Sequence, residues 1–308
     1  NVEDFNETSV PVTLSTQFHV DTQFTTQDLA LSLDMFSDRV LKPAIAAIAN
    51  KIDRDGMAMA TLQTANIVGT AGTPPTGLIT YLTAGAYLDS EGAPRDGRRS
   101  CIVEPFTSAT IVDSLKGLFV PQEAIGEQYR KGLMGRDSAG MNWKMDQNVV
   151  SQTFGSFAGT ATVNTTTATG FLTSGWASSS TITLTATGTV ALNAGDTFQI
   201  AGVYAVNPQN RSAYGSGKLR NFVVTATTTV ASGGGTSVTV SPAIITGGQF
   251  QNVTIIGSTS TTAVVTPFNK AGTVSPQNLV MHKNAFTLAT ADLELPDGVV
   301  FAGRASDK

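Results

Sequence analysis

The chain has 308 residues, 41% of them apolar, which is enough for two domains, or for one domain with an insertion, around a substantial core. Its net charge is −4 and its longest basic run is the pair Arg98-Arg99, which argues against a dedicated DNA- or RNA-binding surface. No run of 18 apolar residues is present, so no membrane-spanning helix is predicted.

Charged residues make up only 14% of the chain, well below the roughly 25% that is typical of soluble domains. A monomer normally presents more charge to solvent, so we expect partner molecules to cover part of the surface. The charges are also unevenly spread, because residues 151–270 carry five of them and the other 188 residues carry 37. The five are Asp196, Arg211, Lys218, Arg220 and Lys270.

Residues 10–20 predict a β-strand at the edge of a sheet. Apolar and polar residues alternate there, as in a strand with one covered face. Pro11 has no N–H to donate and is tolerated at a sheet edge or at a strand start. An edge strand leaves backbone groups available for pairing with a neighbouring molecule. The apolar residues that we take as candidates for contact between subunits are Val10, Val12, Leu14 and Phe18.

A long helix is predicted over residues 26–60. Apolar residues recur there at three- and four-residue spacing for about seven turns. A helix over the whole range would be roughly 50 Å long at about 1.5 Å per residue. Pro43 lacks the N–H that a helix interior needs, so we expect a kink or a split at this residue. The run Asp53-Arg54-Asp55-Gly56 resembles half of a calcium loop without the remaining ligands, and we interpret it as a helix break.

Helices and strands alternate after this helix, which is typical of one α/β subdomain. A glycine-rich loop at residues 69–77 comes first. It lacks the Lys-Ser/Thr pair of a phosphate-binding loop, and Pro74-Pro75 withholds N–H donors, so we interpret it as a turn. The predicted elements that follow are helix 78–90, strand 100–104, helix 106–118, helix 122–133 and strand 141–149.

The composition changes at about residue 157, where Thr, Ser, Gly and Val begin to dominate. Short strands with Gly- and Asn-containing turns indicate an antiparallel sandwich or a small barrel. The predicted strands are 160–164, 180–186, 197–201, 221–227, 236–240 and 251–256. Another strand is predicted from Leu279 onward, so the α/β pattern resumes and the β-module is an insertion rather than a terminal domain.

The sequence contains no credible active site or metal site. His19 and His282 have no second ligand at metal-binding spacing, and we expect both to be surface or interface residues. Cys101 is the only cysteine, so no internal disulfide forms, and we expect it to be a small core residue of a strand. Trp143 and Trp176 are isolated and do not form a stacking platform for nucleic acid.

A group of opposite charges at residues 89–99 is the best candidate for chemistry. Carboxylates beside arginines are one way to build an acid site with an arginine clamp. The interpretation that we favour is a solvated hairpin tip whose charges neutralise one another, so no enzyme and no cofactor are predicted. The residues are Asp89, Glu91, Arg95, Asp96, Arg98 and Arg99.

The order of these elements resembles that of a tailed-phage major capsid protein, and more narrowly the coat-protein family of short-tailed Salmonella phages, whose capsid fold carries an inserted β-barrel. Residues 28–59 are similar to the family's spine helix, residues 194–203 (Ala-Gly-Asp-Thr-Phe-Gln-Ile-Ala-Gly-Val) to a hairpin of its insertion domain, and residues 278–286 to its return segment. The family's charged loop across two-fold axes has no counterpart, because residues 164–180 are nearly neutral.

The resemblance implies an α+β fold of the tailed-phage and herpesvirus capsid type, with an extended loop, a spine helix, axial and peripheral domains, and an inserted antiparallel β-barrel. The implied divisions are 1–25 for the extended-loop strand, 26–77 for the peripheral domain with the spine helix, 78–154 for the axial domain, 155–272 for the barrel and 273–308 for the return. Residues 207–218 would be an exposed loop of the barrel domain. Further candidates for contact between subunits are Arg211 and Lys218 of this loop and Arg220 just after it.

The function that the resemblance implies is self-assembly into the icosahedral head that encloses double-stranded DNA. The expected partners are further copies of the chain in hexamers and pentamers, scaffolding and portal proteins, and DNA held without sequence specificity. We expect the protein in the virion, after assembly in the host cytoplasm and without membrane contact.

Composition leaves one alternative open, a surface adhesin or tail-associated protein whose Thr/Gly-rich β-module binds a ligand. Aromatic side chains on a concave face of the module would favour this alternative. Most aromatic residues of the module fall instead where the cores of strands need filling.

Overall fold

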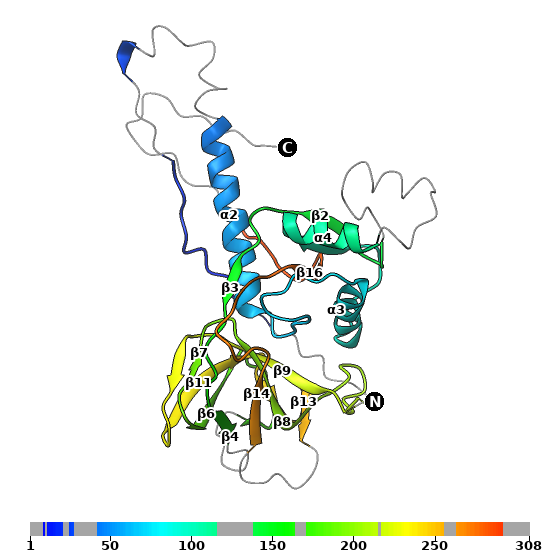
Figure 1. The fold of residues 1–308 in the computed structure, drawn as a ribbon, viewed down its shortest axis with the longest axis vertical. Coiled ribbons are helices and arrows are strands. Elements are labelled where there is room, and N and C mark those ends of the chain that lie inside the picture. Colours follow the sequence, from blue (N-terminus) through cyan, green and yellow to red (C-terminus); the bar gives the residue numbers. More distant parts are fainter. Residues whose placement is uncertain are drawn as a thin grey trace. The chain divides into compact units, whose positions relative to one another are not determined.

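The computed structural model describes residues 9, 11–20, 25–27, 42–115, 138–163, 171–214, 217–255 and 263–291. The chain divides into two units, one formed by residues 1–48 with 286–308 and the other by residues 49–285. The second unit contains the α/β elements and the β-barrel described below (Figure 1).

Helix α2 (Lys42–Gln63) is the described part of the predicted long helix. Pro43 lies in its first described turn, and residues 28–41, where the prediction places the preceding turns, lie outside the described residues. The predicted break at Asp53-Arg54-Asp55-Gly56 is wrong, because α2 passes through all four residues. Gly56 costs a helix about 1 kcal/mol relative to alanine. Burial of Met57 and Ala60 in the next turn outweighs this cost.

A three-stranded sheet forms the α/β part of the second unit. Its central strand is β1 (Arg99–Val103), with β2 (Asn142–Met145) parallel on one side and β16 (Leu279–His282) antiparallel on the other. Helices α3 (Leu78–Ser90) and α4 (Pro105–Leu115) precede and follow β1. The predictions for α3, β1 and β16 are confirmed to within one residue at each described boundary.

Of two further predictions for the α/β part, one is wrong in its length and the other concerns residues outside the described ranges. The strand expected at 141–149 ends early, because the Asp146 carboxylate accepts a hydrogen bond from the Asn148 N–H and turns the chain after β2. The helix predicted at 122–133 lies outside the described residues.

The core of the α/β part lies between the sheet and its helices. Cys101 and Ile111 have no exposed surface, so the core role predicted for Cys101 is confirmed. The prediction that Trp143 is isolated is wrong, because its ring packs on that of Tyr81 with 4.8 Å between the ring centroids. Its indole N–H donates to the Ser138 carbonyl at 2.9 Å, so the whole side chain serves the core.

Within the described residues the β-module is a closed ring of six strands. Hydrogen-bonded neighbours follow the order β8-β14-β4-β6-β11-β9, and β9 pairs back to β8 (Figure 1). A seventh strand, β13, pairs with the far end of β8. The bounds are β4 (Thr160–Val163), β6 (Ser180–Thr187), β8 (Thr197–Ala205), β9 (Leu219–Val224), β11 (Gly235–Ser241), β13 (Val253–Ile255) and β14 (Ala263–Pro267).

The six strands predicted in the module are confirmed with shifted ends, whereas β14 was not predicted. Of the two architectures left open, the barrel is correct, because the pair β8–β9 closes the sheet and so removes its main edges. Two small ribbons complete the module, β7–β10 antiparallel and β5–β12 parallel. Their bounds are β5 (Phe171–Leu172), β7 (Val190–Leu192), β10 (Thr228–Val230) and β12 (Ile244–Ile245).

The barrel core consists of alternate residues along each strand. In β6, Ile182 and Leu184 have no exposed surface, while Thr183 between them is exposed. The rings of Phe198 and Phe222 fill the interior with their centroids 6.3 Å apart. Full burial of one such side chain contributes about 1.5–3 kcal/mol, so apolar packing rather than charge stabilises the module.

The chain enters and leaves the barrel through two paired strands, which we call the neck. β3 (Ser151–Thr153) pairs antiparallel with β15 (Val274–Pro276). Hydrogen bonds extend the pairing at both ends, from the Gln277 N–H to the Val150 carbonyl at 3.0 Å and from the Phe154 N–H to the Thr273 carbonyl at 3.0 Å. Since β2 precedes the neck and β16 follows it, the chain returns to the sheet that it left.

Residues 11–20 do not form a strand, so this prediction is wrong for the single subunit. A strand needs a partner to complete its backbone hydrogen bonds, and the described sheets contain none of these residues. The side chains of Val12, Leu14 and Phe18 are nevertheless 73%, 54% and 38% exposed, so this segment has apolar surface that another molecule could cover. Val10 lies outside the described residues.

We predict that Leu184→Ala lowers the free energy of unfolding by about 2–5 kcal/mol, because it removes buried methyl groups and leaves a cavity in the barrel core. Thr183→Ala, on the exposed face of the same strand, should change it by less than about 0.5 kcal/mol. Urea unfolding followed by circular dichroism measures both values. Equal effects of the two variants would contradict the inward orientation of Leu184.

Candidate functional site

The barrel contacts the α/β part at the C-terminal end of α3. Side chains from β9 and from the loop before it contact the last turn of the helix and the residue that caps it. We call this set the α3 clamp. Its members are Tyr214, Lys218 and Arg220 on the barrel and Tyr87, Ser90 and Glu91 at the end of α3.

The ion pair between Arg220 and Glu91 is the strongest contact of the α3 clamp. The guanidinium Nη1 of Arg220 donates to Oε1 of Glu91 at 2.7 Å and to Oε2 at 2.9 Å. The side chains are 13% and 30% exposed, so the pair is shielded from solvent more than a typical surface ion pair. The Nε of Arg220 is buried without a hydrogen-bond partner in the described part of the chain, which offsets some of the gain.

Two further donors reach the end of α3. The Lys218 ammonium donates to the Ser90 hydroxyl at 2.7 Å and lies 4.0 Å from the centre of the Tyr87 ring, a cation–π distance. The Tyr214 hydroxyl donates to the Ser90 carbonyl. Burial lowers the pKa of Lys218 and raises that of Tyr214. The last carbonyls of a helix carry partial negative charge and lack partners, so cations and hydroxyl donors stabilise this end.

Three of the predicted inter-subunit residues lie at or near the α3 clamp. Lys218 and Arg220 direct their charged groups at α3 of the same chain, so any additional contact with a neighbouring subunit stays a prediction. Arg211 lies in an exposed turn with φ of 55°, and its N–H donates to the Asn207 carbonyl at 2.8 Å. Arg211 therefore remains accessible to another molecule.

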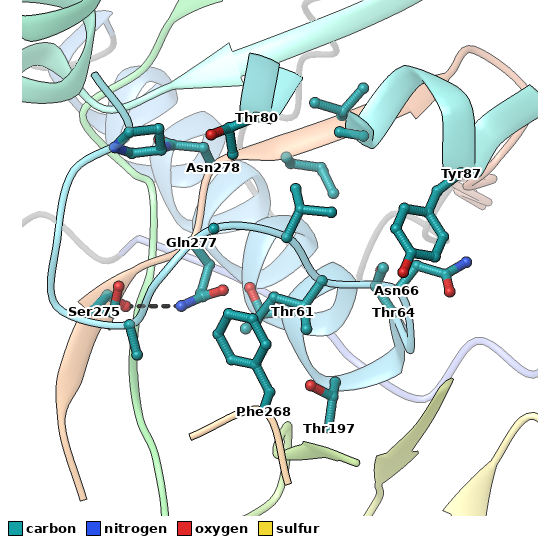
Figure 2. Close-up of a pocket in the computed structure, with 18 of the residues that line it drawn as sticks. Thr61, Thr64, Asn66, Thr80, Tyr87, Thr197, Phe268, Ser275, Gln277 and Asn278 are labelled. Carbon is teal, nitrogen blue, oxygen red and sulfur yellow. Dashed lines mark hydrogen bonds between the residues drawn. The ribbon is translucent and has the colours of Figure 1, made fainter. Parts of the chain in front are cut away.

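A cavity of about 210 Å³ lies beside the α3 clamp (Figure 2). The hydroxyl groups of Tyr81 and Thr197, two of its lining residues, are buried without a hydrogen-bond partner among the described residues. A cavity of this size with polar walls has room for several water molecules. Polar side chains around it include Thr61, Thr64, Asn66, Thr80, Gln277 and Asn278. The barrel is therefore attached by the α3 clamp, the neck and a hydrogen bond from Asn221 Nδ2 to Asn66 Oδ1 at 3.1 Å, rather than by close packing across this gap.

The charged group at residues 89–99 is a network of ion pairs, so the charges neutralise one another as predicted, but the prediction of a solvated hairpin tip is wrong, because the segment joins α3 to β1 and Arg99 is buried. Asp89 accepts from Arg95 and, at 2.8 Å, from the buried Arg99. The hydrogen bond from Arg95 holds the pKa of Asp89 well below its usual range, so this carboxyl has no proton to donate at neutral pH. Glu91 is not part of the network but belongs to the α3 clamp.

His282 is buried, so its predicted place at the surface is wrong. Strand β16 adds to β1 with His282 opposite Arg99, which covers the imidazole. Nδ1 accepts a hydrogen bond from the Asn284 N–H at 3.3 Å. Nε2 therefore carries the proton and donates to the Asp96 carboxylate at 3.1 Å. His19, in contrast, is exposed.

A buried carboxylate fixes the neck to the barrel. Oδ2 of Asp196 accepts from the Gly155 N–H at 2.9 Å and from the Asn193 N–H at 2.8 Å. Gln152 of β3 donates to the Ala194 carbonyl at 2.7 Å beside it. Burial raises the pKa of Asp196, and the two backbone N–H groups oppose this shift. A methyl group on Gly155 would lie 2.1 Å from the Ala191 carbonyl oxygen, so only glycine fits there.

The described residues offer little for other chemistry. They contain no group of three or more His, Cys, Asp or Glu residues that could hold a metal ion. Within the same residues, no helix combines the length and the apolar character needed to cross a membrane. Trp176 is exposed, but the barrel aromatics Phe157, Phe198 and Phe222 are buried in the core and unavailable to a ligand.

Sequence reasoning missed most of the α3 clamp and the lock around Asp196. Tyr214 and Ser90 carry no local signal, because their contact joins residues 124 positions apart. Asp196 did carry a signal, since it is a carboxylate in a run of 120 residues with five charges and stands after a glycine in a turn. A lone charge in an apolar module indicates a buried, hydrogen-bonded role.

We predict that Glu91→Gln lowers the free energy of unfolding by about 1–2 kcal/mol, because it leaves the shielded Arg220 without a countercharge. The control is Asp55→Asn, which cuts the exposed Lys51–Asp55 pair and should cost less than about 0.5 kcal/mol. Urea titration of both variants compares them. A loss for Glu91→Gln no larger than the control's would show that the α3 clamp adds no stability.

We predict a pH-dependent difference between the natural chain and Asp196→Asn. Because the folded pKa of Asp196 is raised, the folded state holds the proton more tightly than the unfolded state. The natural chain should therefore lose stability relative to the variant as pH rises above about 3.9, the usual Asp value, until the folded pKa is passed. Urea unfolding of both proteins between about pH 3 and 8 measures this. A difference that does not vary with pH, or varies the other way, would contradict the assignment.

The site as a whole is thus a β-barrel that is clamped to the α/β part of the same chain. No curated protein matches the chain. The family model described as "P22 coat protein - gene protein 5" matches residues 1–299. Because the match spans nearly the whole chain, the chain belongs to the P22 coat protein family and is a major capsid protein that forms the head of a phage.

Proposed function

We propose that copies of this protein assemble as hexamers and pentamers into a closed icosahedral shell around double-stranded DNA, and that residues 11–20 lie on a neighbouring subunit in the shell. One observation carries the second part of the proposal. Residues 11–20 are exposed throughout, and the apolar Val12, Leu14 and Val20 stand at even positions among polar residues, so the subunit leaves these apolar side chains in water.

The segment would complete its backbone pairing on a neighbour. An extended chain with apolar side chains on one face pairs readily with a sheet edge or lies in an apolar groove. Each such contact is weak on its own. A shell repeats it in every subunit, and the sum of many weak contacts becomes large without any one being strong.

The remaining divisions of the chain are proposed from the resemblance. Residues 1–25 would be the extended loop, residues 26–77 the peripheral domain with its spine helix, and residues 78–154 the axial domain. Residues 273–308 would return to the axial and peripheral domains. Residues 155–272 would be a brace, a role that the α3 clamp and the neck support, because both bind the barrel to its own subunit.

The proposed partners follow from the shell. Scaffolding and portal proteins would guide assembly in the host cytoplasm, and DNA would fill the finished head. A subunit with a net charge of −4 suits a wall that must not hold its genome tightly, since phosphate binding depends on Lys and Arg. Arg211 is the one of the three predicted barrel contacts that remains available to another subunit, because it is exposed whereas Lys218 and Arg220 bind α3 of the same chain.

The alternative of an adhesin or tail-associated binding protein finds no support. It requires aromatic side chains on a concave face of the β-module. Phe157, Phe198 and Phe222 of the module instead fill its core, Trp176 alone among its described aromatic residues is exposed, and the family match concerns a coat protein.

We predict that Val12→Asp with Leu14→Asp abolishes shell formation by the purified full chain, because two charges would have to be buried in the contact. The matched control is Thr13→Asp with Ser15→Asp, which adds the same charge to the alternate residues. Negative-stain micrographs and sedimentation velocity distinguish shells from free subunits. We expect shells from the natural chain and the control, and folded monomers from the first variant.

Two outcomes would count against the proposal. Shells from both double variants at equal yield would remove residues 11–20 from the interface. A natural chain that stays monomeric under every assembly condition, with and without a scaffolding protein, would contradict self-assembly itself.

A further inference from the structure

Helix α3 has an apolar outer face. Its exposed residues are Ile79, Leu82, Thr83 and Ala86, which are spaced three and four apart and so share one side of the helix. Ile79 is 70% exposed and Leu82 is 45% exposed. No charged residue occurs in α3 before Asp89, so for nearly three turns this side offers water only apolar and hydroxyl groups.

The inner face of α3 is already used. Tyr81 is buried against Trp143, and Leu78 packs on the same core of Cys101 and Val103. A helix with one covered side normally carries charged residues on the other, whereas a helix that is apolar all round is normally covered on all sides. In the described part of the subunit, other residues cover only the inner face of α3.

A hollow of about 370 Å³ lies beside this face. Leu82, Gly85 and Ala86 line it from α3, and Ala139 and Gly140 of a tight turn line it from across. Apart from Leu82, these side chains are small or absent, so a group from another molecule can approach the backbone closely. Asp89, Arg95 and Arg99 line one side of the hollow, where both arginines pair with Asp89, and the other lining residues are uncharged.

We infer that the outer face of α3 and the hollow beside it form an interface with a second copy of this chain. The inference rests on the proposed shell and names a contact in it other than residues 11–20. A second copy is the partner present at every subunit of a shell, so a face covered by it is never left in water after assembly. An uncharged face also needs no countercharge on the partner and loses no ion hydration on burial.

Thiol labelling tests this inference directly. The chain has one cysteine, Cys101, which has no exposed surface and whose pKa burial raises to about 12, so it reacts poorly with maleimides. An Ile79→Cys variant therefore carries one reactive thiol, at an exposed site where the change should not disturb folding. The matched control is Val264→Cys, at a 49% exposed position on the outer face of β14. A small maleimide is applied to monomers and to assembled shells of each variant.

We expect fast labelling of both variants as monomers, and labelling at position 79 that is at least about tenfold slower in shells while position 264 keeps its rate. Equal rates at position 79 in monomers and shells would overturn the inference while leaving the proposed shell intact. Slow labelling in the monomer would also overturn it, because the face would then be covered within the chain. Equal protection at both positions would overturn it as well, since the protection would not be local to α3.

A second variant separates assembly from folding. Ile79→Gln with Leu82→Gln should leave the urea midpoint of the monomer unchanged and lower the shell yield several-fold. A lowered midpoint with an unchanged shell yield would assign the face to intramolecular packing and overturn the inference. Failure of the natural chain to assemble at all would instead reject the proposed function.

Discussion

The two ends of the barrel segment have to meet, because the central strand β1 takes β2 from before the barrel and β16 from after it. The paired strands of the neck hold the two ends together, and the Asp196 carboxylate holds the neck against the barrel. The α/β sheet is therefore complete only when the long segment between its strands has closed. An ordered barrel with adjacent ends lowers the entropic cost of that closure, so the folding of one part prepares the other.

Charge is used sparingly in the barrel and mostly for attachment. Asp196 fixes the neck, and Lys218 and Arg220 bind the end of α3. Three of the five charges in residues 151–270 thus serve the join between the two parts of the subunit. The apolar interior stabilises the barrel itself. Its charged side chains instead attach the barrel to the rest of the subunit.

Local sequence patterns predicted most helices and strands, but they could not predict contacts between residues far apart in the sequence. Alternation identified β6, and Pro105 with the apolar spacing identified the helices on either side of β1, because these signals lie within a few residues. The break expected at Gly56 failed because burial of the next turn is a tertiary effect that no local run reveals. The α3 clamp could not be predicted at all, since Glu91 and Arg220 are 129 positions apart and each looks like an ordinary surface charge. The strand expected at residues 11–20 illustrates the opposite case, a local pattern for which the described sheets provide no partner strand.

The attachment of three barrel charges to the subunit's own residues has a consequence for the outside of the barrel. Only Arg211 and Lys270 remain as exposed charges on residues 151–270, and the rest of that surface is largely Thr, Ser and Gly. Dissolved salt acts on exposed charges by screening and barely affects hydroxyl groups and backbone. Contacts made by the barrel surface away from Arg211 and Lys270 should therefore be almost insensitive to ionic strength, so any salt dependence of the particle would have to arise at these two residues or in the charged α/β parts.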